Sequence, residues 1–219
     1  ILQGGFLFST LPTEVWKDPY VVNERRSATD RNSRGIQLTL DKAFGSKFEL
    51  EYTYRNIDLD KERSGEFLGF SDRDRDLLDR NGDNHRGVVR YYYKFAEKQF
   101  FVPSFSLTYD DRDGKAMRNY RYFFNFMYTY AGDPATLIVS AGFGHSDYDK
   151  RNPVFGKSRE DDNYTATAVF YYKNPWDWTL LGSKPMQFAL SGAYGLSDSN
   201  IDFYTQELIS VNVGVLFKW

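Results

Sequence analysis

The stretch ISVNVGVLFKW, residues 209–219, alternates between apolar and polar side chains. One face of this stretch carries Ile209, Val211, Val213, Val215, Phe217 and Trp219, and the other carries Ser210, Asn212, Gly214 and Lys218. A period of two is typical of a β-strand that separates two unlike environments. The apolar face therefore needs either a protein core or lipid to cover it.

The same alternation recurs along the whole chain, which we treat as one domain over residues 1–219. Further strands are predicted near residues 2–8, 36–41, 48–55, 89–95, 101–109, 119–130, 137–144, 164–173 and 186–197. The prediction is an all-β chain of about ten antiparallel strands. Counts of eight or twelve are the alternatives, because the first strand is short and residues 59–84 could hold another hairpin.

The predicted connections alternate in length. Short links fall at 44–46, 97–98 and 132–134, with a somewhat longer one at 174–184. Long polar links cover 10–33, 59–84, 111–116, 149–162 and 198–205. This asymmetry is typical of an up-and-down transmembrane β-barrel with short periplasmic turns and long extracellular loops. An even number of strands then places both termini on the periplasmic side.

Composition narrows the function classes. The net charge of -2 argues against nucleic acid as a partner, and the absence of cysteine excludes disulfides and thiolate metal sites. No apolar stretch approaches the roughly 20 residues of a membrane-spanning helix, and we expect any export signal to have been removed before Ile1. We predict no cofactor.

Aromatic residues make up 18% of the chain, which favours lipid over a dry core as the cover for the apolar face. A soluble β-sandwich or a lipocalin-like barrel is the alternative. The predicted membrane-interface aromatics are Tyr120, Tyr122, Tyr128, Tyr130, Trp176, Trp178 and Trp219. The predicted interior charge network consists of Asp41, Glu49, Glu51, Arg55, Arg90, Lys94, Arg121 and Lys173.

The C-terminal strand, with Val213, Val215, Phe217 and Trp219, resembles the assembly signal of bacterial outer-membrane β-barrel proteins. That resemblance implies an outer-membrane location and recognition by the outer-membrane insertion machinery. The stretches KDPYVVNERR, LDRNGD, RDGKAM and RNPVFGK further resemble an uncharacterised domain-of-unknown-function group of such barrels. The narrower resemblance implies no activity.

Three functions remain open at the level of sequence. We expect a non-enzymatic outer-membrane barrel whose narrow polar or ion-paired interior makes it a small-solute channel or a structural barrel. The alternative is a module whose long loops recognise a protein or polysaccharide partner or take part in envelope assembly, with lipopolysaccharide as a neighbour. An omptin-like rim hydrolase is the third; its candidate residues are Asp110, Asp111, Asp113, His145, Asp147 and Asp149. His145 falls on the lipid-facing side of its strand, which argues against that third function.

Asp79, Asn81 and Asp83 have the alternate spacing that begins a calcium-binding loop. Asn84 then stands where such loops need glycine, and Arg90 where they need a bidentate Glu. We therefore predict no metal site and keep these three residues as a weak candidate.

Overall fold

The computed structural model describes residues 2–13, 29–43, 47–59, 71–173 and 186–216. The strands are β1 Leu2–Thr13, β2 Thr29–Lys42, β3 Phe48–Leu59, β4 Gly82–Tyr91, β5 Tyr93–Ala96, β6 Gln99–Arg112, β7 Asn119–Ala131, β8 Ala135–Asn152, β9 Lys157–Lys173, β10 Gln187–Ser199 and β11 Gln206–Leu216. Two short helices accompany them, α2 at Asp72–Leu77 and the 3₁₀-helix η2 at Asp202–Tyr204.

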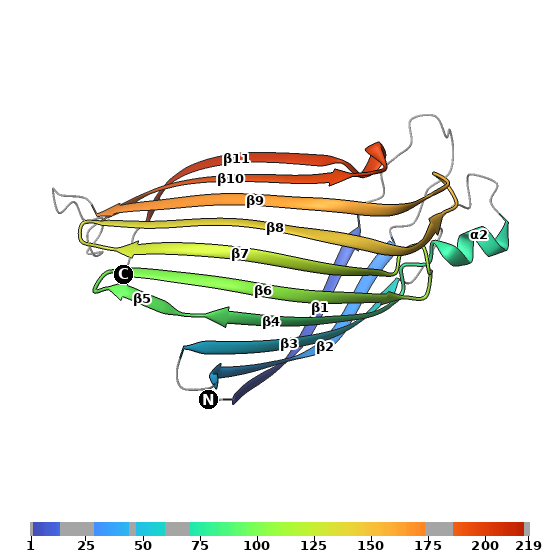
Figure 1. Ribbon diagram of the computed structural model, residues 1–219, viewed down its shortest axis with the longest axis horizontal. Coiled ribbons are helices and arrows are strands. Elements are labelled where there is room, and N and C mark those ends of the chain that lie inside the picture. Colours follow the sequence, from blue (N-terminus) through green and yellow to red (C-terminus); the bar gives the residue numbers. More distant parts are fainter. Residues whose placement is uncertain (1, 14–28, 44–46, 60–70, 174–185, 217–219) are drawn as a thin grey trace.

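All strands form one antiparallel sheet in which, apart from the short β5, neighbours in space are neighbours in sequence (Figure 1). The order is β1-β2-β3-β4-β6-β7-β8-β9-β10-β11, and β5 pairs with β6 beside it. The short β5 follows β4 after a break at Tyr92, whose backbone N–H donates to the Lys47 carbonyl at 2.7 Å. The predicted all-β, up-and-down arrangement of about ten strands is therefore confirmed.

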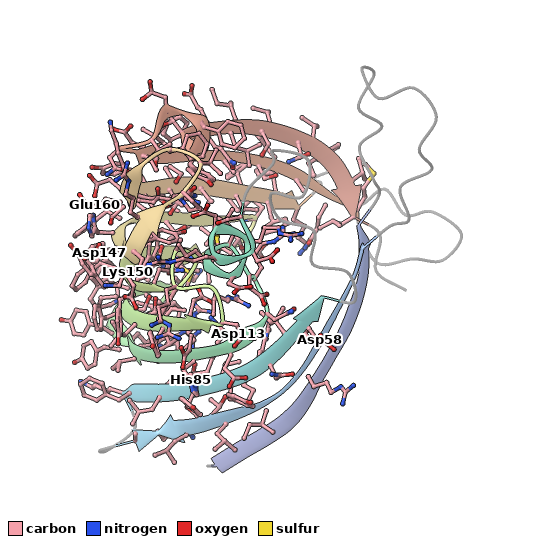
Figure 2. All side chains as sticks on the ribbon, turned by 90° about the vertical axis from the view of Figure 1, so that its right-hand side faces the viewer. Asp58, His85, Asp113, Asp147, Lys150 and Glu160 are labelled. Carbon is pink, nitrogen blue, oxygen red and sulfur yellow. The ribbon has the colours of Figure 1, made fainter. Side chains whose placement is uncertain are left out.

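The sheet curls strongly about an axis along the strands, as the end-on view of Figure 2 shows. Its two edges are β1 and β11, and no ladder joins them among the residues that the structure describes. Buried side chains of the strands lie on one face, and this face is the concave one; examples are Thr53, Val88, Thr108 and Ser146. The opposite, convex face exposes large apolar side chains, because nothing in the described chain covers it.

Helix α2 lies in the long connection between β3 and β4, which the sequence predicted only as a polar loop. Ser71 caps it by accepting a hydrogen bond from the Asp74 N–H, and Asp72 and Asp74 stand in its first turn. In Figure 1 α2 lies beyond the strand ends, and in Figure 2 it falls within the outline of the curled sheet. No helix in the described part of the chain has the length and apolar character needed to cross a membrane.

The β8–β9 hairpin differs from its predicted form. The sequence predicted a loop over residues 149–162, but β8 continues to Asn152 and β9 begins at Lys157. Asn152 holds the tight turn, since its Oδ1 accepts from the Val154 N–H at 2.9 Å and its carbonyl accepts from the Gly156 N–H at 2.8 Å. Gly156 adopts φ 69°, a conformation that favours glycine.

Gly82, the first residue of β4, has a backbone conformation that favours glycine. Its φ is 127°, and a Cβ there would lie 2.3 Å from the Asp111 carbonyl oxygen. We expect Gly82→Ala to lower the free energy of unfolding by about 1–3 kcal/mol, as measured by urea denaturation of the purified protein. Gly87→Ala on the same strand is the control, because a Cβ there meets no atom within 4 Å. Equal effects of the two substitutions would contradict the strained start of β4.

Candidate functional site

Two belts of aromatic side chains cross the convex face, one near each end of the strands. The belt near the long connections includes Tyr109 and Tyr120, stacked at 4.4 Å between ring centroids, with His85 stacked on Tyr109 at 6.5 Å. Near the short turns, Phe95 lies between Tyr93 and Tyr128, at 6.1 Å from each ring. The convex face is thus aromatic at both ends of its strands.

Between these belts the convex face is apolar. Phe124 lies at its middle, 4.8 Å from the ring of Phe105 and 5.3 Å from that of Phe143. Of the predicted interface aromatics, Tyr120 and Tyr122 lie toward the long connections, and Tyr128 and Tyr130 toward the short turns. Trp176, Trp178, Phe217 and Trp219 lie outside the described residues; Val213 and Val215 are exposed on the convex side of β11.

The first polar cluster of the concave face lies near the short-turn end and is centred on Arg90. The Arg90 guanidinium donates to Glu49 at 2.5 Å and to Glu51 at 3.0 Å. Tyr92 donates its hydroxyl to the second oxygen of Glu49 at 3.1 Å, and Asp41 faces Glu49 across the β2–β3 ladder. Two of the predicted carboxylates therefore bind one guanidinium and a third, Asp41, lies beside Glu49 on the neighbouring strand. We call these four residues the lower cluster (Asp41, Glu49, Glu51 and Arg90).

The remaining predicted members lie elsewhere. Lys94 lies over the Phe100 ring at 5.6 Å and is exposed. Lys173 approaches Asp133 to 3.8 Å at the short-turn end. Arg121 is 3.8 Å from Asp110, and Arg55 makes no ion pair with any described carboxylate. The sequence thus predicted one network where the structure has separate groups.

A second polar cluster, the upper cluster, lies on the concave face near the long connections. Asp110 is buried and accepts from Arg112 at 2.7 Å and from the Asn84 amide at 2.9 Å. Asp161 is buried as well and pairs with Arg159 at 2.7 Å. The Arg159 guanidinium also lies over the rings of Tyr148 at 4.8 Å and Tyr204 at 3.9 Å. The upper cluster therefore consists of Asp110, Arg112, Arg159, Asp161 and Tyr148.

Sequence reasoning missed the upper cluster because it ended the strands too early. Asp110 follows the predicted strand 101–109, and Asp161 fell in the predicted loop 149–162. Both residues have the same parity as neighbouring polar residues of their strands, Thr108 and Asn163. Extending the strict alternation by one residue beyond 109 and by three residues before 164 would have placed both carboxylates on the concave face.

The rim candidates for hydrolysis do not converge. Asp111 pairs with Arg118 at 2.8 Å, whereas Asp110 lies on the concave face. His145 lies on the convex face and contacts Asp162 at 2.8 Å through Nδ1, while Ser146 is buried on the opposite face. Asp147 faces Glu160 across the β8–β9 ladder, and Figure 2 shows both on the outside of the curl, apart from Asp113. No nucleophile–histidine–carboxylate arrangement forms among these residues.

The weak calcium candidate is also dispersed. Asp79 accepts from the Asn81 N–H at 2.9 Å, and Asp83 accepts from Tyr54 and Asn56 on β3. Within the ranges that the structure describes, no group of three or more His, Cys, Asp or Glu side chains is placed to hold a metal ion.

The profile of a protein family matches residues 4–218, and the family is described as proteins of unknown function (DUF2860). The chain belongs to the DUF2860 family. No curated protein matches its sequence. The match overlaps every strand of the sheet, and the description of the family names no activity. The all-β antiparallel sheet fits a protein of the β-barrel type.

In this DUF2860 protein, two stretches that resemble the barrel group in sequence contact each other. The Gly114 N–H of RDGKAM donates to the Asp79 carbonyl of LDRNGD at 3.1 Å, and the Asp113 N–H donates to the Asn81 carbonyl at 2.9 Å. Leu78, in the first of these stretches, is buried. These backbone bonds fasten the α2 connection to the β6–β7 connection at the end of the curled sheet.

Proposed function

We propose that this chain is an integral outer-membrane β-barrel and that its polar concave face forms a narrow passage for small solutes. The observation that carries the proposal is the reversed polarity of the sheet. Large aromatic and aliphatic side chains are exposed on the convex face, whereas most of the buried side chains on the concave face are small and polar or charged. A soluble sheet of this size hides its apolar face, whereas a sheet in lipid turns that face outward.

The dimensions of the apolar band support the same proposal. On β7 the aromatic belts are marked by Tyr120 and Tyr130, the ends of one alternating run. Ten steps of about 3.4 Å correspond to roughly 34 Å along a strand. A tilt of about 40° reduces this to about 26 Å, close to the roughly 25 Å height of the apolar band in outer-membrane barrels.

The polar interior supports a passage rather than an enzyme. Glu49 and Glu51 in the lower cluster and Asp110 and Asp161 in the upper cluster are paired with arginines. The histidines, His85 and His145, lie on the other face. Charged side chains that line a narrow barrel are the usual basis of solute selection. In this proposal the protein is not an enzyme and needs no cofactor.

The orientation follows from the connections. The short links after β5 and β7 face the periplasm, together with both termini, and the long-connection end faces outward, where the convex rim meets lipopolysaccharide. Mixed charges at that rim, such as Asp147, Lys150 and Glu160, suit phosphate groups and their bridging cations (Figure 2). Membrane lipid and the insertion machinery are the remaining partners that the proposal implies; nucleic acid is not among them.

The test is the ionic current through the refolded protein in a planar lipid bilayer. We expect stable, small conductance steps, because the interior of about ten strands is narrow and partly filled by side chains. A shift in gel migration on heating shows that the sample is folded. A folded sample that gives no steps would contradict the passage.

A second candidate function is recognition through the long-connection end, in which the barrel only presents a binding surface. It is favoured by the ordered aromatic group there, in which Phe155 contacts Phe203 and Tyr204 at 5.3 and 5.4 Å. Phe203 is 74% exposed. A silent barrel whose binding to lipopolysaccharide vesicles is lost on Phe203→Ser would favour this role over the passage.

A further inference from the structure

The concave face carries an excess of positive charge near the long connections. In this half, strands β3 to β9 contribute the arginines Arg55, Arg86, Arg112, Arg121 and Arg159, against the two aspartates Asp110 and Asp161. Toward the short turns, the same strands contribute Glu49 and Glu51 against Arg90, Lys94 and Lys173, and Asp41 of the neighbouring β2 balances the third cation. The surplus of three positive charges therefore belongs to the upper half.

The upper aspartates are already neutralised by two of these arginines. Arg112 binds Asp110 at 2.7 Å and also donates to the Arg80 carbonyl at 3.0 Å, so its position is fixed. Arg159 binds Asp161 at 2.7 Å and is stacked on Tyr204. This leaves Arg55, Arg86 and Arg121, of which only Arg121 approaches a described carboxylate, at 3.8 Å from Asp110.

These three arginines lie close together on the sheet. Arg86 and Arg121 share one register row, separated by Thr108, which puts their Cα atoms roughly 10 Å apart. Arg55 pairs with Asn84 and is the diagonal neighbour of Arg86, at about 7–8 Å. Thr108 and Thr53, which faces Arg86, are buried at the base of this group. Because Thr53 and Thr108 are small, the three guanidinium groups can occupy the space above them.

All three side chains are exposed, and 44% of the Arg121 side chain is accessible. Like charges on adjacent strands repel one another, which costs stability unless an anion lies between them. Guanidinium groups present paired N–H donors that match the oxygens of carboxylate and phosphate. The group thus has the charge and the donors of a site for a small oxyanion.

We propose that Arg55, Arg86 and Arg121 form an anion-binding constriction and that the passage selects small anions bearing carboxylate or phosphate groups. The inference rests on the proposed passage, since it names the class of solute that would use it. The sign of the selected ion follows from the charge of the lining side chains. Rings of arginine or lysine line pores for anions and phosphate, whereas rings of acidic residues line pores for cations.

The experiment is a measurement of reversal potential across a bilayer in a KCl gradient, with inorganic phosphate added as a blocker. We expect the wild-type protein to favour chloride over potassium. Each of Arg55→Gln, Arg86→Gln and Arg121→Gln should lower that permeability ratio about sixteenfold, because one unit charge about 5 Å away in water changes chloride and potassium by about fourfold each, in opposite directions. Block by phosphate should weaken in parallel.

The matched control is Arg34→Gln, which removes the same charge from the convex face of the neighbouring strand β2. It should leave the permeability ratio unchanged. A permeability ratio that favours potassium, or that is the same in the wild-type protein and in all three concave variants, would contradict the anion site. Conductance steps would still support the passage.

A folded but silent protein would instead overturn the passage, and phosphate titration by calorimetry then decides the site separately. Binding that is lost in the triple Gln variant and kept in Arg34→Gln would support the anion site without a passage. An absence of binding in the wild-type protein would overturn the site as well. The two proposals therefore fail by different results.

Discussion

Phe124→Arg is expected to lower the free energy of unfolding in phospholipid vesicles by about 2–4 kcal/mol, the cost of an arginine at the midplane of a barrel's lipid-facing surface. Phe124 is 36% exposed at the middle of the convex face, between Phe105 and Phe143. In a sheet whose convex face met water, the charge would cost nothing, and only aromatic contacts worth about 0.5–1.5 kcal/mol would be lost.

Tyr120→Arg is the matched control for depth. Tyr120 is on the same strand and face, is 52% exposed, and loses a comparable ring contact, with Tyr109. At the interface an arginine costs only about 0–1 kcal/mol. The difference in unfolding free energy between the two variants therefore measures the cost of placing the charge in hydrocarbon. Urea titration of vesicle-inserted protein, followed by tryptophan fluorescence, gives both values. Equal losses for Phe124→Arg and Tyr120→Arg would mean that lipid does not cover the convex face.

The sequence predicted which face of each strand is apolar, and the structure shows why. The alternation of β7, from Tyr120 to Tyr130, persists because its two faces have different surroundings along the whole run. That difference fixes register, since a shift by one residue would exchange the faces of a strand. Cross-strand partners such as Asp41 and Glu49 then follow from the turn that joins them.

Strand ends and charge partners could not be predicted in the same way. Beyond Asp147 both faces of the β8–β9 hairpin carry polar residues, so the alternation that marks a strand disappears while backbone pairing continues to Asn152. The alternation also shows only which face a side chain is on, and it does not show which cation pairs with which carboxylate. Lys94 has the same parity as Arg90, but the break at Tyr92 separates their strands, and Lys94 lies over Phe100 instead.

Arg90→Met is expected to cost about 3 kcal/mol of unfolding free energy, the lower end of the range for removing one partner of a buried ion pair. The side chains of Arg90, Glu49 and Glu51 are 27%, 20% and 12% exposed, so water screens the two remaining carboxylates only in part. Methionine keeps most of the apolar stem and removes the guanidinium. The loss of unfolding free energy therefore comes from the two carboxylates left without a cation rather than from a cavity.

Combining Arg90→Met with Glu49→Gln and Glu51→Gln should recover most of that loss, because the two carboxylates that Arg90 neutralises then carry no charge either. Lys94→Met is the control, as it removes an exposed cation of the same face that binds no described carboxylate, and it should change stability by less than about 0.5 kcal/mol. A triple variant as unstable as Arg90→Met would show that the guanidinium acts through packing. If the triple variant regains stability and keeps the wild-type ion selectivity, the lower cluster holds the strands together while selection belongs to the arginines above it.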